Sequence, residues 1–91
     1  MYTVYILKSL QMHRFYIGHA KDVMVRLSRH NKGLIRSTRF ARPWGIVYTE
    51  VYSTKSAARK RELQIKSFKS GEGLRKLLQS SRAGTEAVKR T

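Results

Sequence analysis

One carboxylate stands out among the side chains that could do chemistry, because the chain has only 5 Asp and Glu residues against 20 Lys and Arg. Glu62 shares a predicted helix face with Ala58 and Ile65, which lie one turn before and after it. A carboxylate within an apolar stripe needs a cation nearby. Two interpretations are open. Glu62 is either part of an ordinary helix ion pair with Arg59 or Lys66, or a ligand for Mg²⁺, which takes one or two carboxylates together with substrate phosphate.

A second pair of polar residues lies on the preceding predicted helix. Arg26 and His30 are one turn apart and therefore share a face. This face is offset by one residue from the apolar stripe of the same helix, so we expect both side chains to be semi-exposed at its rim. An arginine can hold a phosphate through two parallel hydrogen bonds, and a histidine can exchange a proton near neutral pH. The alternative is a solvated basic face that also includes Arg29 and Lys32.

Two tyrosines and a glycine lie on two short predicted strands. If Tyr5 and Tyr16 face each other across a hairpin, both side chains emerge on one face of the sheet. A phenol there can donate a hydrogen bond to a phosphate, orient a water molecule or transfer a proton, or it can form an aromatic pair that only packs. Gly18 ends the second strand. Its missing side chain would permit close approach of a backbone or ligand, although a simple turn glycine has the same appearance.

Arginines recur at every third residue along the loop after the first predicted helix, with Phe40 and Trp44 among them. This pattern is typical of a phosphate track with stacking surfaces, although Trp44 follows a proline at a strand start and fits a core position equally well. His13 and His19 have no acidic or Cys partner at ligand spacing and receive no role. The residues expected to contact nucleic acid are Gly18, Lys21, Arg36, Arg39, Arg42 and Lys66.

The elements that must position these residues follow from apolar patterning and end signals. β-Branched and aromatic residues predict three strands, over residues 2–7, 15–18 and 44–52. Helices are expected from a cap at Asp22 to about Asn31, from a cap at Ser53, Thr54 or Ser56 to about Phe68, and over residues 72–78. Gly33 is placed to end the first helix.

This order of elements, ββαβα(α), predicts a mixed α/β domain of α+β-like character. The hairpin of the first two strands makes the three-stranded sheet largely antiparallel, and helices must flank it to cover its apolar faces. We expect residues 1–79 to form one domain. Residues 80–91 are small, polar and basic with no packing face, so we expect a disordered tail.

The formal net charge of +15 makes nucleic acid the first candidate partner, because phosphate contacts supply most non-specific affinity. A basic protein without such a partner is the alternative, and an anionic membrane surface is disfavoured because no clean basic amphipathic helix is present. The absence of cysteine excludes disulfides, thiolate zinc sites and cysteine nucleophiles. There is no signal-peptide pattern and no apolar run long enough to span a bilayer, so we expect a cytoplasmic protein.

Taken in order, these motifs resemble those of the GIY-YIG nuclease family over residues 2 to 68, and most closely its small single-domain bacterial members. Thr3-Val4-Tyr5 looks like a degenerate first motif, and Tyr16-Ile17-Gly18 is an intact second motif. Residues 18–27 are similar to the start of the family's arginine-bearing helix, and residues 59–66 are similar to its E-x-x-I-K helix. The resemblance implies a GIY-YIG-type domain over residues 1–79.

The resemblance also implies roles for the matching residues. Glu62 would be the ligand of a single Mg²⁺ or Mn²⁺ ion, and Arg26 would bind the scissile phosphate. Tyr5 would act as the general base or orient the attacking water, with Tyr16 supporting it by hydrogen bonding and His30 sharing the acid/base work. The chain departs from the family in two places: the first motif reads TVY, and no asparagine follows the glutamate helix, where repair-type relatives have one.

The leading hypothesis is therefore a divalent-metal-dependent endonuclease that cleaves DNA, selects structure rather than sequence, and serves repair or recombination. RNA is the alternative substrate. The second hypothesis is a non-catalytic nucleic-acid-binding protein on the same fold, and the third is a basic structural protein of a ribonucleoprotein particle. We expect a monomer or weak dimer with no membrane partner and no disulfide-linked partner.

Overall fold

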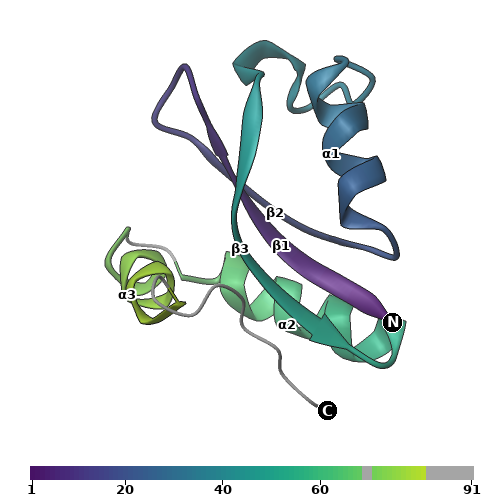
Figure 1. Cartoon of the computed structure of the whole chain (residues 1–91). Helices are drawn as coiled ribbons and strands as arrows, with labels where there is room; N and C mark the ends of the chain where they lie inside the picture. The colour runs from purple at the N-terminus through teal and green to yellow at the C-terminus, as the bar shows by residue number, and fades with distance from the viewer. Residues whose placement is uncertain (69–70, 82–91) are drawn as a thin grey trace.

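The computed structural model describes residues 1–68 and 71–81 of the 91-residue chain. The expected order of elements is confirmed (Figure 1): β1 (Tyr2–Ser9), β2 (Phe15–Ala20), α1 (Val23–Asn31), a short 3₁₀ turn η1 (Arg39–Ala41), β3 (Trp44–Tyr52), α2 (Lys55–Lys66) and α3 (Gly71–Ser81). Helix α3 is longer than expected and includes Ser80 and Ser81, which had been assigned to a disordered tail. The rest of that tail, residues 82–91, lies outside the described residues.

The three strands form one sheet in the order β2-β1-β3, with both pairings antiparallel. Tyr5 lies opposite Gly18 on β2, and Leu7 lies opposite Tyr16. Both β1 and β2 are two residues longer than expected. The end of β1 is extended by pairing with β3, up to Ser9 opposite Trp44, and the end of β2 by pairing of His19 and Ala20 with Val4 and Thr3 of β1. Strand β1 is therefore the central strand, and β2 is an edge strand.

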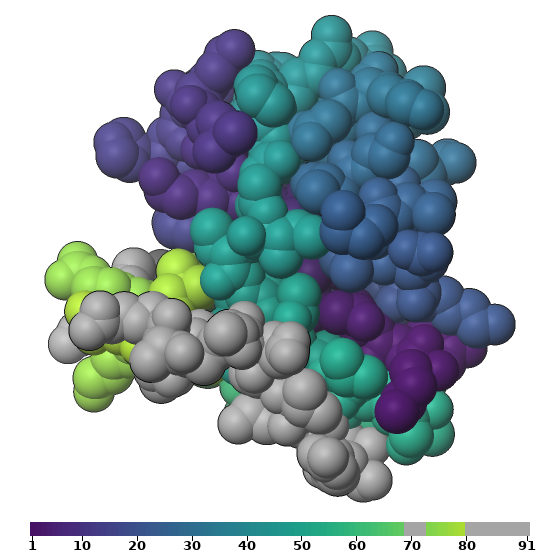
Figure 2. All heavy atoms as spheres, viewed as in Figure 1, coloured from purple at the N-terminus to yellow at the C-terminus, as the bar shows by residue number. Residues whose placement is uncertain are grey.

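Side-chain alternation divides the sheet between two layers of helices. On one face of the sheet a core of Tyr5, Leu7, Ala20, Ala41 and Trp44 packs against α1. On the other face Val4, Ile6, Tyr48, Tyr52, Ala58 and Ile65 form a second core under α2, and apolar residues of α3 pack against it. Figure 1 shows α1 on one side of the sheet and α2 with α3 on the other. In the space-filling view (Figure 2), β3 forms the surface between the β1–β2 hairpin and α1.

Helices α1 and α2 each begin at a side-chain cap. The Asp22 carboxylate accepts hydrogen bonds from the backbone N–H groups of Met24 and Val25 at 3.1 and 3.2 Å. At the start of α2, Thr54 is the capping residue among the three candidates, and its hydroxyl accepts from the Ala57 N–H at 3.1 Å. Such caps each stabilise a helix by about 1 kcal/mol. They fix where each helix begins relative to the sheet.

Gly33 ends α1 as expected, and its backbone has a φ of 77°. A side chain here would be strained by that conformation. It would also collide with Arg42, because a Cβ on Gly33 would lie 1.7 Å from the Arg42 Nη1 atom. The loop that follows α1 is thus folded back tightly against the helix end.

None of the helices in the described part of the chain is long and apolar enough to cross a membrane.

Candidate active site

The candidate catalytic residues meet around the edge strand β2, and they reach it from both faces of the sheet. Tyr5, Tyr16, Arg26 and His30 belong to the layer of α1, whereas Glu62 belongs to the layer of α2. Because β2 has no strand beyond it in the described structure, side chains from the two layers can approach each other past its outer side.

Gly18 makes room for the Tyr5 ring. The two residues are paired across β1 and β2, and a Cβ on Gly18 would lie 2.8 Å from the Tyr5 hydroxyl oxygen and 3.1 Å from Cε2 of Tyr16. Both distances are shorter than an ordinary contact. Gly18 is buried and packs beneath the two tyrosine rings, while its expected contact with nucleic acid stays a prediction. The missing side chain lets the Tyr5 hydroxyl lie across the edge strand.

A chain of hydrogen bonds runs from Tyr5 into α1 and the following loop. The Tyr5 hydroxyl lies 3.3 Å from His30 Nε2, and His30 Nδ1 lies 2.8 Å from the Thr38 hydroxyl. Thr38 donates its own proton to the Ile35 carbonyl at 3.4 Å, so its oxygen must accept from His30 Nδ1–H. His30 Nε2 is then the unprotonated nitrogen and accepts from the Tyr5 hydroxyl. His30 is thus the hydrogen-bond acceptor of the Tyr5 hydroxyl.

His30 is fully buried, contrary to the semi-exposed position expected at the rim of α1. The reason is the loop that carries Thr38 and Trp44, which covers this face of α1; the sequence spacing of the helix alone cannot show such a cover. Burial, followed by the positive charge of Arg26, lowers the pKa of His30 to about 4. His30 is therefore neutral near pH 7, as the hydrogen-bond chain requires.

The phenol of Tyr5 is held in its protonated form. Burial raises the pKa of Tyr5 well above its usual value of about 10, and the neighbouring Tyr16 and the charge of Glu62 raise it further, while the charge of Arg26 lowers it. Arg26 thus acts on both Tyr5 and His30, which places its guanidinium beside the hydrogen-bond chain. Glu62 acts on Tyr5 from the opposite layer, so a charge in the layer of α2 influences the pKa of a residue in the layer of α1.

Tyr16 completes the aromatic part of the site. Its ring centroid lies 4.8 Å from that of His30 and 6.3 Å from that of Tyr5, and Trp44 approaches its other side at 6.5 Å. Tyr5 and Tyr16 are diagonal neighbours on the same sheet face rather than directly opposite each other. Tyr16 is half-buried, so this side chain packs the site and still reaches its surface.

On the other face, Glu62 is held by a lysine and a histidine. Lys66 Nζ lies 2.7 Å from one carboxylate oxygen, as the helix spacing predicted, and His19 Nδ1 contacts the other oxygen. Although burial raises the pKa of Glu62, the hydrogen bonds from Lys66 and His19 lower it overall. The carboxylate is therefore ionised, and its side chain is 13% exposed. It remains reachable from solvent at the strand edge.

Reasoning from sequence missed His19, because a ligand spacing was sought only among neighbouring residues. His19 and Glu62 are 43 residues apart in the chain. Strand alternation was the available signal. It places His19 on the face opposite to Tyr16 and Gly18, and that face must be covered by the second helix.

A buried ion pair next to Glu62 fixes the orientation of α2. Glu50 of β3 is fully buried, and its two oxygens accept from Arg61 Nε at 2.9 Å and Nη2 at 3.0 Å. The hydroxyls of Tyr48 and Tyr52 also donate to the Glu50 carboxylate. Burial raises the pKa of Glu50, but these four hydrogen bonds lower it overall. Because Arg61 immediately precedes Glu62, the pair holds Glu62 at a set rotation of the helix. Sequence reasoning assigned Glu50 no role.

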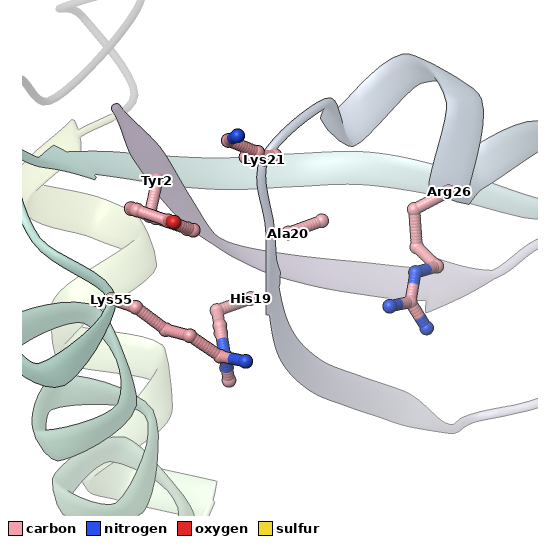
Figure 3. A pocket seen from close by; sticks show the side chains of 6 residues that line it. All are labelled: Tyr2, His19, Ala20, Lys21, Arg26 and Lys55. Atoms are coloured by element: carbon pink, nitrogen blue, oxygen red, sulfur yellow. The ribbon is translucent and has the colours of Figure 1, made fainter.

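Arg26 and His19 line one surface depression of about 290 Å³, so α1 and β2 contribute to a common opening. Figure 3 shows both side chains extending toward this opening, Arg26 from α1 and His19 from β2. Glu62 is not among the residues that line the depression, but its carboxylate contacts His19, which does line it. Lys21 is exposed and lines the same depression, in line with its expected contact with nucleic acid.

All three arginines of the loop after α1, Arg36, Arg39 and Arg42, are exposed. Two of them also make contacts within the loop, because Arg39 Nε donates to the Gly33 carbonyl at 3.0 Å and Arg42 packs against Gly33. Trp44 is buried and donates to the Thr38 carbonyl at 2.9 Å, so it belongs to the core and offers no stacking surface. Phe40 is exposed, and Arg14 lies over its ring at 5.3 Å.

The donor set around Glu62 fits a metal ion that is shared with a substrate. No three His, Cys, Asp or Glu side chains gather as a metal-binding group among the described residues, which excludes a site built from such side chains alone there. Mg²⁺ commonly takes one or two carboxylates and completes its shell with water and substrate phosphate. Glu62 meets this requirement if one carboxylate oxygen exchanges its Lys66 or His19 partner for the ion.

The similarity of this chain to known proteins identifies its family. The sequence model of the GIY-YIG catalytic domain matches residues 1–73. Among curated proteins, the chain is 46% identical over 61 residues to the UPF0213 proteins of Staphylococcus aureus strains Mu3, Mu50 and N315, an alignment that spans 66% of this chain and 74% of each relative. No solved structure matches significantly. The match over most of the chain, together with the motifs it contains, establishes that this protein belongs to the GIY-YIG family of nucleases.

Proposed function

We propose that this protein is a divalent-metal-dependent endonuclease that hydrolyses phosphodiester bonds, with structured DNA as its favoured substrate. The observation that carries the proposal is the convergence of Arg26, the Tyr5–His30 hydrogen-bond chain and Glu62 around the edge strand β2. Arg26 lines the surface depression beside β2, and the ionised Glu62 carboxylate contacts His19, which lines the same depression.

Arg26 binds the phosphate that is attacked. Its guanidinium can hold two phosphate oxygens by parallel hydrogen bonds, and it stabilises the additional negative charge that develops during attack. Arg26 is half-buried and lines the depression beside His19, so its charge is screened less than that of a fully exposed side chain. The same positive charge favours the ionised form of Tyr5.

Tyr5 and His30 position the attacking water. Thr38 holds His30 in the tautomer whose Nε2 accepts from the Tyr5 hydroxyl, so the Tyr5 oxygen is left to accept a hydrogen bond from the water. The water gives its proton to solvent as its oxygen bonds to phosphorus and the bond to the leaving oxygen breaks. The departing oxygen takes its proton from solvent. Holding the reacting groups in the geometry of attack can supply up to about 7 kcal/mol of the barrier reduction.

Glu62 would hold one Mg²⁺ or Mn²⁺ ion together with a substrate phosphate oxygen, and His19 would orient the carboxylate. When bound, the ion stabilises negative charge on the phosphate and the leaving oxygen, a contribution of several kcal/mol. The Glu50–Arg61 pair keeps Glu62 directed toward the strand edge.

The test is cleavage of branched, flapped and linear DNA, and of matched RNA, in Mg²⁺ or Mn²⁺. We expect metal-dependent cleavage by the wild-type protein and at least about 10²-fold slower cleavage by Arg26→Ala and Glu62→Gln. Arg29→Ala is the matched control, because Arg29 is exposed on the same helix. A wild-type protein without metal-dependent cleavage, or a Glu62→Gln variant with full activity, would show the proposal to be wrong.

One observation favours a second candidate, a non-catalytic nucleic-acid-binding protein. Both oxygens of Glu62 are already paired, with Lys66 and His19, so the carboxylate has a structural role without any ion. This candidate predicts salt-sensitive binding to nucleic acid that is unaffected by chelators and by Glu62→Gln. Binding with those properties and no cleavage of any substrate would favour it.

A further inference from the structure

The depression beside Arg26 extends beyond the residues that the proposed chemistry uses. It is lined by Tyr2, His19, Ala20, Lys21, Arg26 and Lys55, which come from β1, β2, the β2–α1 turn, α1 and α2. Figure 3 shows Tyr2 and Lys55 on the side of the opening away from Arg26. Its volume of about 290 Å³ is small for a drug-sized molecule and suits a phosphate with part of a nucleotide.

Three cationic side chains line this depression, Lys21, Arg26 and Lys55, and none of them forms an ion pair with a carboxylate of the described residues. Lys21 and Lys55 are both exposed. Lys55 is also the first residue of α2, where the positive end of the helix dipole adds to its charge. An anion in the depression would therefore meet Lys21 from one side and Lys55 from the other.

The position of Lys55 separates this anion from the phosphate that faces Tyr5. Lys55 precedes Glu62 by seven residues, so both side chains lie on nearly the same face of α2, about 10 Å apart along its axis. An anion held by Lys55 is consequently displaced along the helix from the carboxylate. A second phosphate of the same nucleic-acid strand meets this requirement.

Tyr2 adds a second nucleotide-binding feature. It is half-buried on β1, and its hydroxyl makes no hydrogen bond within the described structure. Its ring forms one wall of the depression in Figure 3. An aromatic face beside cationic groups is the combination with which proteins bind a strand, since the base stacks while its phosphate is neutralised.

We propose that this depression is a second phosphate subsite, in which Lys21 and Lys55 hold one phosphate of the nucleic-acid strand next to the phosphate bound by Arg26. The subsite deepens the proposed function, because it rests on the binding of nucleic acid at the same opening. It would position the strand in a domain in which no asparagine follows the glutamate helix.

The test is the salt dependence of DNA binding, measured by fluorescence anisotropy in EDTA so that neither metal nor cleavage contributes. The slope of log affinity against log salt should fall by about 0.9 on duplex DNA, or about 0.7 on a single strand, in Lys55→Ala. If both proteins bind equally at 1 M salt, this slope makes Lys55→Ala about eightfold weaker on duplex DNA at 0.1 M. Lys60→Ala, an exposed lysine on another face of α2, should change the slope by less than half as much.

A double variant tests whether the two lysines share one phosphate. In Lys21→Ala/Lys55→Ala the duplex slope should fall by about 0.9 in total, because only one phosphate loses its neutralising charge. A fall of about 1.8 would assign the lysines to separate phosphates and overturn the subsite, as would an unchanged slope in Lys55→Ala. Wild-type protein that binds no nucleic acid would overturn both proposals. Lysine-dependent binding without any metal-dependent cleavage would overturn the nuclease proposal alone.

Discussion

Replacing Gly18 by alanine should displace the Tyr5 hydroxyl. Because the substitution adds one methyl group and changes no charge, its effect on stability and cleavage would come from this displacement alone. The added Cβ would lie 2.8 Å from the Tyr5 oxygen, 3.0 Å from Tyr5 Cζ and 3.1 Å from Tyr16 Cε2. Ordinary contacts begin at about 3.4 Å, so the hydroxyl must move by about 0.6 Å. That movement occurs at the atom that contacts His30, whose Nε2 lies 3.3 Å away.

Two effects of opposite sign decide the stability of Gly18→Ala. Alanine loses less backbone freedom than glycine on folding, which favours the variant by about 0.4–1 kcal/mol. Overpacking a buried site costs about 1–3 kcal/mol. The clash involves two tyrosine rings held by their neighbours, so we expect the second effect to prevail and the variant to be less stable by about 1–2 kcal/mol. Because displacements near 1 Å at a reacting group can cost about 10²-fold, cleavage should fall by at least about tenfold.

Gly45 provides a matched control on another strand of the sheet. A Cβ on Gly45 would lie 3.8 Å from Leu10 Cδ2, an ordinary contact, so Gly45→Ala should be as stable as the wild type or slightly more stable. Urea unfolding measures both variants, and cleavage assays measure Tyr5 placement. Adding Tyr5→Phe to Gly18→Ala removes the closest of the clashing atoms, so the two substitutions should be non-additive by at least about 0.5 kcal/mol. Equal stability of Gly18→Ala and Gly45→Ala would refute this account of the glycine.

Two further predictions concern buried ionisable groups. The lowered pKa of His30 means that the unfolded chain binds more protons than the folded one between about pH 4 and the unfolded value near 6.5. The stability contributed by neutral His30 is thus complete above pH 6.5 and falls by roughly 3 kcal/mol toward pH 4. Urea unfolding of His30→Gln should lack this pH-dependent loss of stability. A wild-type free energy of unfolding that is constant between pH 6.5 and pH 4 would contradict the burial of His30. Glu50→Gln should destabilise the protein by about 3 kcal/mol, because it removes the charged acceptor of Arg61 and two tyrosines. Since the pKa of Glu50 is lowered on folding, its contribution is present above the unfolded value near 4.3 and disappears on acidification below it, so acid titration of wild type and Glu50→Gln should converge at low pH.

Local signals in the sequence were sufficient to predict the helices and strands and their order along the chain. Strand β3 begins at Trp44 and ends at Tyr52 as predicted, because a proline precedes it and capping residues follow it. Helix α1 likewise has Asp22 at its start and Gly33 beyond its end. The lengths of β1 and β2 were underestimated because their ends are stabilised by pairing with neighbouring strands, and pairing depends on residues far away in the chain.

The candidate site was predictable only in part, for a related reason. Helix and strand periodicity identified the side chains that share a face, and family motifs supplied their roles. Contacts between elements were beyond such reasoning: His19 with Glu62, His30 with Thr38, and Glu50 with Arg61. Each of these contacts joins two segments whose relative placement is set by the packing of both cores.

The origin of the site in two layers has a consequence for how the protein would lose function on heating. The tyrosines and the arginine depend on the core under α1, and the glutamate depends on the core under α2. Loosening either core alone would disperse part of the constellation while the sheet between them persists. The proposed activity would therefore depend on both cores at once, and it should be lost on heating at the temperature at which the less stable of the two layers unfolds.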